Sequence, residues 1–398
     1  MTKSQKKEML LKVASKMFAE KGFAGTSIAK MAKAAGVRET IIYELFSGKE
    51  DLLFNIPVEK TVTLIESLTE HLEGITGAEN KLRKMIWHYL NFQENNREYA
   101  TIILFELRPN RRFYGTKSYD SFKDYNKIVM DILKEGADEG VFHGKICLPL
   151  FRNLIFGALE HVILSWILFD KNKTPVEHAK ELCDLLFAVA KPEQLDEGES
   201  KDQKEEWALD KRDSILKVAM SLFAEKGFAK TRISDIANAL NIGEASIYEY
   251  FKNKEDILFS IPMEKTGELL TAVTERFKEN RKAEMELRDF VREYLFFLQK
   301  NKIYTAILLF ELRSNRRFYK ANAYQKVKEF NDILMGILKR GQADDSFGKE
   351  VNIHLVSHMI FGSIDHLALT WVLFGKPSSL LEYSDALTWL FLKALNDR

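Results

Sequence analysis

The sequence has few cysteines and lacks an uncharged apolar run as long as a membrane span. Its 398 residues include two cysteines, Cys147 and Cys183, without CxxC spacing. We therefore expect both to be buried free thiols in a reducing cytoplasm. The longest apolar stretch, residues 153–169, contains Glu160 and His161 and is shorter than the ~20 residues of a membrane helix. No signal peptide opens the chain, so we expect a cytoplasmic protein without a membrane partner.

The motifs of common enzyme classes are also missing. We find no phosphate-binding glycine loop, no HExxH, no nucleophile elbow and no paired Cys/His spacing, which argues against an enzyme. We predict no catalytic residue, no metal and no cofactor. The net charge of +1 gives no global basic field, so any binding of nucleic acid must depend on local charge. Only seven prolines interrupt a long helical periodicity, which predicts an all-helical soluble protein.

Residues 231–258 have the pattern of two short helices joined by a tight turn. A short apolar face is formed by Ile236, Ala237 and Leu240. Asn241-Ile242-Gly243 is a turn signal because Asn and Gly tolerate left-handed backbone. Residues 244–250 follow as the second helix, and Asn253 is a candidate N-cap of the next helix. Such a pair is a helix-turn-helix, whose second helix can enter a DNA major groove.

The same pattern occurs 205 residues earlier, and the correspondence extends over most of the chain without a gap. Among the matched pairs are Tyr43 and Tyr248, Phe46 and Phe251, Lys49 and Lys254, residues 105–108 and 310–313 (both FELR), and residues 110–114 and 315–319 (both NRRFY). Each copy spans about 190 residues, which indicates a duplicated subunit and not a short-period solenoid. In the first copy we expect helices near residues 4–21, 28–34, 39–45, 49–73, 78–95, 98–108, 114–138, 148–169 and 175–190, the last with Thr174 as N-cap.

The N-terminal part of each copy, which contains the helix-turn-helix and is called the head below, resembles the DNA-binding domain of TetR-family transcriptional repressors. The resemblance rests on Gly22-Phe23, Thr26, Ile28, Ala32, Gly36-Val37, Tyr43, Phe46 and Lys49-Glu50, and on Gly227-Phe228, Thr231, Ile233, Ile236-Ala237, Ile242-Gly243, Ser246-Ile247-Tyr248, Phe251 and Lys254-Glu255. It implies an all-α fold of two tandem TetR-like units. Each unit would have an N-terminal helix-turn-helix domain and a helical ligand-binding and dimerisation domain.

The domain organisation follows from the repeat and the resemblance. We predict DNA-binding domains at residues 1–50 and 207–255, helical effector and dimerisation domains at 51–191 and 256–398, and an acidic flexible linker at 192–206. The family's homodimers pair through their last two long helices. Covalent linkage would make this pairing intramolecular, so we expect a monomeric chain that is itself a pseudo-two-fold dimer. The alternative is that two chains each supply one repeat, as in a domain swap.

The resemblance also assigns DNA contacts. It implies phosphate contacts for Thr26, Ser27, Tyr43, Lys49, Thr231, Arg232, Tyr248 and Lys254, and base reading by Arg38, Thr40 and Ile41 in one head and by Glu244, Ala245 and Ser246 in the other. Two unlike heads favour an asymmetric or imperfectly palindromic operator in double-stranded DNA. The charge is modest, with nine basic and six acidic residues over 6–51 and eight and seven over 211–256. The alternative is a ligand- or partner-binding protein whose heads no longer read DNA.

In the family the body of each unit holds an effector. The body here resembles the FadR-like fatty-acid regulators, which implies a lipophilic, acyl-CoA-like small molecule. The candidate ligand residues are Tyr89, Phe92, Arg108, Arg111, Tyr125, His161 and Trp166 in the first repeat, and Tyr294, Phe297, Arg313, Arg316, Phe330, His366 and Trp371 in the second. Aromatic side chains at helical spacing and buried histidines are more often core residues than ligand contacts, so the core is the alternative for these residues. The arginines could form either a mouth for an anionic ligand or a charged joint between head and body. We predict a sequence-specific transcriptional repressor that the effector releases from DNA.

Overall fold

The computed structural model describes residues 2–142, 146–169, 173–190, 211–276 and 281–396. Helices dominate these residues, and none of them lies in a strand. The chain divides into two compact units, one built on residues 1–190 and one on residues 191–360 and 364–398. The predicted linker at residues 192–206 lies outside the described part of the chain.

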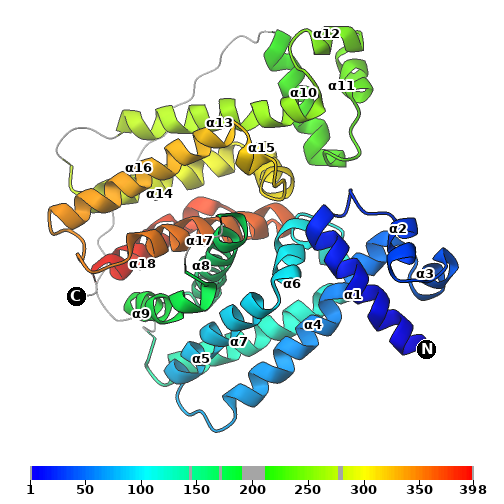
Figure 1. The fold of residues 1–398 in the computed structure, drawn as a ribbon. Helices are drawn as coiled ribbons and strands as arrows, with labels where there is room; N and C mark the ends of the chain where they lie inside the picture. The colour runs from blue at the N-terminus through cyan, green and yellow to red at the C-terminus, as the bar shows by residue number, and fades with distance from the viewer. Residues whose placement is uncertain (1, 143–145, 170–172, 191–210, 277–280, 397–398) are drawn as a thin grey trace. The chain divides into compact units, whose positions relative to one another are not determined.

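The first unit contains an N-terminal head of three helices, two of them short, and a helical body (Figure 1). Its elements are α1 (Lys3–Lys21), α2 (Ile28–Ala34), α3 (Glu39–Leu45), α4 (Lys49–Leu72), α5 (Ala78–Asn95), α6 (Arg97–Ile102), the π-helix η1 (Ile103–Leu107), the 3-10 turns η2 (Phe113–Gly115) and η3 (Lys117–Tyr119), α7 (Asp120–Asp138), α8 (Leu148–Phe169), the 3-10 turn η4 (Pro175–His178) and α9 (Ala179–Ala190). The head packs on the body where α1 contacts α4 and α6.

The second unit repeats this order. It contains α10 (Lys211–Lys226), α11 (Ile233–Leu240), α12 (Glu244–Tyr248), α13 (Lys254–Arg276), α14 (Ala283–Lys300), α15 (Lys302–Ile307), the π-helix η5 (Leu308–Leu312), the 3-10 turn η6 (Phe318–Lys320), α16 (Tyr324–Ala343), α17 (Ile353–Phe374), the 3-10 turn η7 (Leu380–Tyr383) and α18 (Ser384–Asn396). Here α10 contacts α13 and α15.

The predicted helices agree with these bounds, with three differences. The segment at 98–108 begins as α6 but ends as the π-helix η1. The segment at 114–138 begins with the 3-10 turns η2 and η3 before α7. Thr174 and Pro175 stand at the predicted N-cap and first position, but the first turn is 3-10 and the Thr174 hydroxyl makes no capping hydrogen bond.

The turn between the two short helices of each head uses a left-handed residue at the same position. Gly36 has φ 65° and Asn241 has φ 54°, as expected of the two residue types that tolerate this conformation best. Gly243, the other residue of the predicted turn, has φ −72°. Asn253 caps α13 as predicted, since its Oδ1 accepts from the Asp256 amide at 2.9 Å.

A second duplicated device closes the end of α7 and of α16. The ring of Phe142 lies directly against Gly136, where a β-carbon would overlap it, and Phe347 lies against Gly341 in the same way. Phe142 also packs against Phe151 at 5.5 Å between ring centroids. Glycine is therefore required here so that the chain can fold back onto its helix.

Both cysteines are free, but only Cys183 is buried, so the prediction of a buried Cys147 is wrong.

By length and composition α8 and α17 could each cross a membrane, but 72% and 67% of their most apolar windows are buried inside the protein. Core helices of soluble proteins have the same property.

Candidate DNA-binding and effector sites

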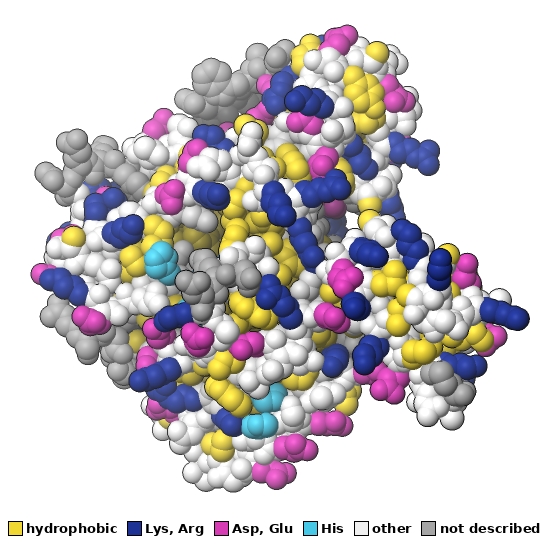
Figure 2. Space-filling view, viewed as in Figure 1, with side chains coloured by type: hydrophobic (Ala, Val, Ile, Leu, Met, Phe, Trp, Pro, Cys, Tyr) yellow, Lys and Arg dark blue, Asp and Glu magenta, His cyan; other side chains and the backbone are white. Residues whose placement is uncertain are grey.

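The first head presents a polar recognition helix. Met31 and Ala32 of α2 and Ile42 of α3 are buried and hold the two helices together. The opposite face of α3 and the residue before it are exposed, with Arg38, Glu39, Thr40, Tyr43 and Glu44, while Ile41 is half-buried. Tyr43 is 58% exposed, which is unusual for a large aromatic ring and leaves its hydroxyl free to reach a ligand. Figure 2 shows Lys and Arg side chains spread over the surface of this head.

The second head has the same frame and a different surface. Its recognition helix α12 has five residues where α3 has seven. Glu244, Ala245 and Tyr248 are exposed, and Ser246 is half-buried. Tyr248 is 52% exposed, so the tyrosine is common to both heads while the base-reading positions are not.

Thr26 and Thr231 have a structural role that differs from the predicted one. Thr26 is 2% exposed and Thr231 is 1% exposed. The Thr26 hydroxyl donates to the Met17 carbonyl at 3.3 Å or to the Gly22 carbonyl at 3.0 Å, and Thr231 bonds to the equivalent carbonyls. These hydroxyls close the turn after the first helix of each head. Their prediction as phosphate contacts is therefore wrong, because they face the interior.

Lys49 and Lys254 are likewise directed into the heads. The Lys49 ammonium donates to the Phe23 carbonyl at 2.8 Å and the Thr26 carbonyl at 2.9 Å, and it lies 4.0 Å from the centroid of the Phe23 ring. Lys254 makes the same contacts in the second head at 2.7, 2.8 and 4.3 Å. Burial lowers the pKa of Lys49, and the nearby Glu106 carboxylate acts in the opposite direction. Two of the three donors of each ammonium are thus used to fix a loop, and the phosphate contact of these lysines stays a prediction beside this structural role.

Residues 27 and 232 begin the second helix of each head by different means. The Ser27 hydroxyl caps α2 by accepting from the Lys30 amide at 3.3 Å. At the equivalent position the Arg232 side chain is exposed, and its backbone amide donates to the Asp235 carboxylate at 2.8 Å. Because Ser27 can still donate its hydroxyl proton, both residues remain available to a phosphate.

A charged joint connects the first head to its body. Glu106, in the π-helix η1, accepts from the Phe23 amide at 3.0 Å in the loop that Lys49 also holds. Two residues further on, Arg108 forms an ion pair with the buried carboxylate of Glu160 in α8. Arg112 pairs with Glu50, in the first turn of α4, at 3.1 Å. Sequence reasoning did not identify Glu106, although the FELR repeat contains it.

The second unit has the same joint. Arg313 pairs with Asp365 of α17, and Arg317 with Glu255 of α13 at 3.5 Å. Because Arg108 and Arg313 are committed to these buried carboxylates, the hypothesis that they form an anion-binding mouth is wrong for this conformation. Their arrangement is the charged joint that was its alternative. Arg111 is exposed and Arg316 is half-buried. Arg108 and Arg313 directly follow the π-helices η1 and η5. Such helices are rare and are frequently found at functional sites.

The candidate aromatic residues of the bodies are mostly buried. Tyr89, Phe92 and Tyr125 in the first unit and Tyr294, Phe297, Phe330 and Trp371 in the second are each less than 10% exposed. Tyr89 and Tyr125 are brought together at 6.0 Å between centroids, with Phe156 of α8 completing the cluster. Trp166 is half-buried under the Arg97 guanidinium at 4.3 Å. His161 and His366 are half-buried on α8 and α17.

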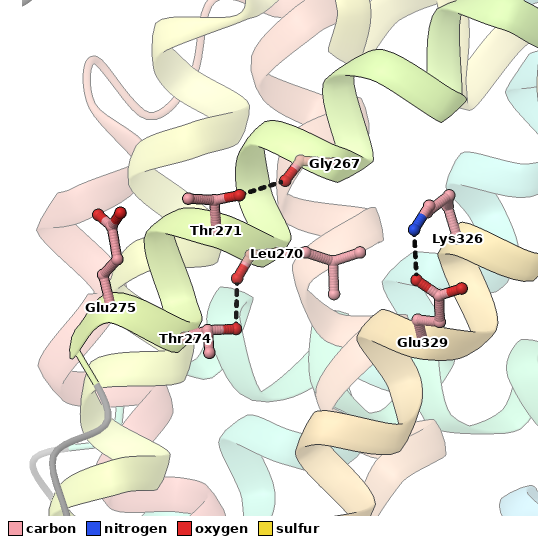
Figure 3. Close-up of a pocket in the computed structure, with 7 residues that line it drawn as sticks. All are labelled: Gly267, Leu270, Thr271, Thr274, Glu275, Lys326 and Glu329. Atoms are coloured by element: carbon pink, nitrogen blue, oxygen red, sulfur yellow. Dashed lines mark hydrogen bonds and ion pairs between the residues drawn. The ribbon is translucent and has the colours of Figure 1, made fainter.

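The second unit also has an open groove of about 650 Å³ between α13 and α16. Figure 3 shows Thr271 and Thr274 bonded to the carbonyls of Gly267 and Leu270 in their own helix, and Lys326 paired with Glu329 at 2.7 Å. Four of the polar side chains that line this groove, Thr271, Thr274, Lys326 and Glu329, are therefore engaged with one another or with their own backbone. The groove offers little for specific recognition of a small molecule.

One cluster of the first unit was not identified from the sequence. His88 of α5 is 3% exposed, and its Nε2 lies 2.7 Å from the Ser67 hydroxyl of α4. The His71 ring lies 5.1 Å away between centroids. In the second unit the equivalents of His71 and His88 are Arg276 and Glu293, which form an ion pair at 2.9 Å. A pair of neighbouring histidines in one unit is thus replaced by an ion pair in the other.

This cluster predicts that acid destabilises the first unit selectively. Burial, together with the neighbouring His71 and Lys84, lowers the pKa of His88 from 6.5 to about 4. Because the pKa is lower in the folded state, the stabilisation is complete above pH 6.5 and is lost as the pH falls towards 4. We expect the free energy of unfolding of the first unit, measured with denaturant, to fall between pH 7 and 5. It should fall less in His88→Gln. Equal pH dependence in both proteins would contradict this role.

Two family models match this chain, and each matches twice. The model described as "Bacterial regulatory proteins, tetR family" matches residues 10–56 and 215–261. The model described as "YsiA-like protein, C-terminal region" matches residues 58–189 and 263–394, which is more than half of the chain.

Known relatives match about one repeat at a time. The "Fatty acid metabolism regulator protein" of Bacillus subtilis is 28% identical over 184 residues, covering 46% of this chain and 95% of that protein. The "HTH-type transcriptional repressor KstR2" of Rhodococcus jostii is 27% identical, covering 36% of this chain and 72% of that protein. A solved structure of the regulator FadR from Bacillus subtilis in complex with stearoyl-CoA has 28% identity and a TM-score of 0.43, covering 45% of this chain and 97% of that one.

Proposed function

The chain belongs to the TetR family, as a ligand-responsive DNA-binding transcriptional regulator with two TetR-like units in tandem, and we propose that one chain does the work of a homodimer. The observation that carries this proposal is the pair of complete heads, each of which exposes a tyrosine at the same position of its recognition helix. The predicted domain boundaries and the monomeric state of the chain are part of the proposal.

We place the DNA contacts on the exposed side chains of the heads. Tyr43 and Tyr248 would donate to phosphate, assisted by Ser27 and Arg232. Arg38 and Thr40, with Ile41 beside them, would read bases in one half-site, and Glu244, Ala245 and Ser246 in the other. Glutamate accepts from cytosine N4, whereas arginine donates to guanine. The two half-sites are therefore expected to differ in sequence.

We further propose repression that is relieved by a lipophilic, acyl-CoA-like effector in a cytoplasmic protein. The support is the relative that regulates fatty acid metabolism and the buried aromatic cluster in the body of the first unit. The relatives named above are regulators of transcription, which agrees with the lack of enzyme motifs in the sequence.

The test is selection of bound duplexes from a random pool, with the mass of the complex measured on the selected DNA. We expect one asymmetric site bound by a single chain. A variant in which residues 243–246 are replaced by the amino acids found at residues 38–41 should select a more palindromic site. A palindrome selected by the unaltered protein and bound by two chains would contradict the proposal, and so would a pool without enrichment.

A further inference from the structure

Among the equivalent interior positions at which the two units differ are Tyr125 in α7 and Phe330 in α16. Both side chains are 4% exposed. The Tyr125 hydroxyl is buried and has no hydrogen-bond partner among the described residues. Since phenylalanine packs at this position in the second unit, the fold does not require the hydroxyl. A buried polar group without a hydrogen-bond partner destabilises the folded state, so the presence of this hydroxyl in one unit only indicates a use other than packing.

The neighbours of these two residues also differ. The Tyr125 ring lies 6.0 Å from the Tyr89 ring and 6.1 Å from the Phe156 ring. One turn before Tyr89, the buried position 85 of α5 is a methionine. Methionine is unbranched and flexible, so it can adjust to an apolar guest.

In the second unit an aromatic stack occupies the equivalent place. Phe290, the equivalent of Met85, stacks on Phe330 with ring centroids 4.8 Å apart and planes inclined by 19°. Tyr294, the equivalent of Tyr89, lies 5.0 Å from the Phe330 ring. Opening this interior to a ligand would require separation of two well-packed rings, which costs more than displacement of a methionine.

We infer that the first unit alone binds the effector, and that the Tyr125 hydroxyl donates a hydrogen bond to a carbonyl oxygen of a lipophilic ligand such as a long-chain acyl thioester. This inference rests on the proposed function for the class of effector. It adds the unit, the anchoring residue and a stoichiometry of one effector per chain. The second unit then contributes a DNA-binding head and the contacts for assembly, and its interior is filled by its own side chains.

The first test is calorimetric titration of the full chain with stearoyl-CoA. We expect one molecule per chain and a dissociation constant about tenfold weaker in Tyr125→Phe, which is the factor for one hydrogen bond. Phe330→Tyr is the matched control and should leave the dissociation constant unchanged. Two equal sites per chain, or an unchanged constant in Tyr125→Phe, would overturn the inference.

Thermal unfolding without ligand gives a second, independent result. Removal of an unpartnered buried hydroxyl should maintain or raise the unfolding temperature, so Tyr125→Phe should be at least as stable as the unaltered protein. A lower unfolding temperature would mean that the hydroxyl is satisfied within the fold, and the inference would fail. If stearoyl-CoA does not bind while Tyr125→Phe is stabilised, the acyl-CoA class is wrong and the polar site in the first unit stands.

Discussion

Replacement of Lys49 by alanine is expected to abolish DNA binding by the first head through loss of its fold. The Lys49 ammonium holds two backbone carbonyls in the loop between α1 and α2 and covers the Phe23 ring. Hydrogen bonds to a charged group contribute about 1.5–3 kcal/mol each to stability. The free energy of unfolding of the head should therefore fall by about 3 kcal/mol. Helix α2 follows this loop directly, and α3 is positioned by α2. Thermal unfolding and DNA titration of Lys49→Ala would measure both effects.

The salt dependence of DNA binding separates this role from a phosphate contact. Each lysine–phosphate contact that is lost lowers the slope of log K against log salt by about one. Lys30 on α2 is exposed, so Lys30→Ala is the surface control and should reduce the slope at unchanged stability. Lys254→Ala should repeat the Lys49 result in the second head. If Lys49→Ala instead keeps its stability and loses one unit of slope, the lysine contacts phosphate as the family resemblance implied.

Local sequence rules predicted nearly all of the helical framework. Thr174-Pro175 marks a helix start, Gly36 and Asn241 mark the turns, and the apolar spacing sets the long helices, because these signals act within a few residues of one another. The π-helix η1 was not predictable in this way. Its residues Ile103–Leu107 have ordinary helical composition, and the change in hydrogen bonding accompanies contacts of Glu106 and Arg108 with distant segments.

The direction of side chains at the sites was harder to predict. The family resemblance gave the positions of Thr26 and Lys49 but not whether these groups face solvent or the interior. That depends on the packing of α4 against the α1–α2 loop, which brings together residues about 25 positions apart. Tyr43 behaves differently because a short recognition helix with one buried residue, Ile42, leaves its next residue exposed.

Separation of the Arg108–Glu160 pair is expected to destabilise the first unit by about 3–5 kcal/mol, the usual cost when one partner of a buried pair is removed. Glu160 is 7% exposed, so Arg108→Met leaves its carboxylate in the interior without the guanidinium. The double variant Arg108→Met with Glu160→Met removes both charges and should recover much of the loss. Denaturant unfolding of the two single variants and the double variant measures the coupling. Simple additivity of the single effects would contradict a coupled pair.

The same variants test whether this pair supports DNA binding. Glu106, which bonds to the Phe23 amide of the head, and Arg108 are separated by one residue at the end of η1. Loss of the Arg108–Glu160 pair should therefore displace η1 and with it Glu106. This displacement would weaken the hydrogen bond that anchors the head loop, even at temperatures where the body stays folded. Lys123→Met breaks an exposed pair with Asp120 and is the control, since such pairs contribute little. DNA affinity should fall in Arg108→Met, stay low in the double variant if the displaced η1 is responsible, and remain unchanged in Lys123→Met. Recovery of affinity together with stability in the double variant would mean that the pair affects DNA only through the stability of the fold.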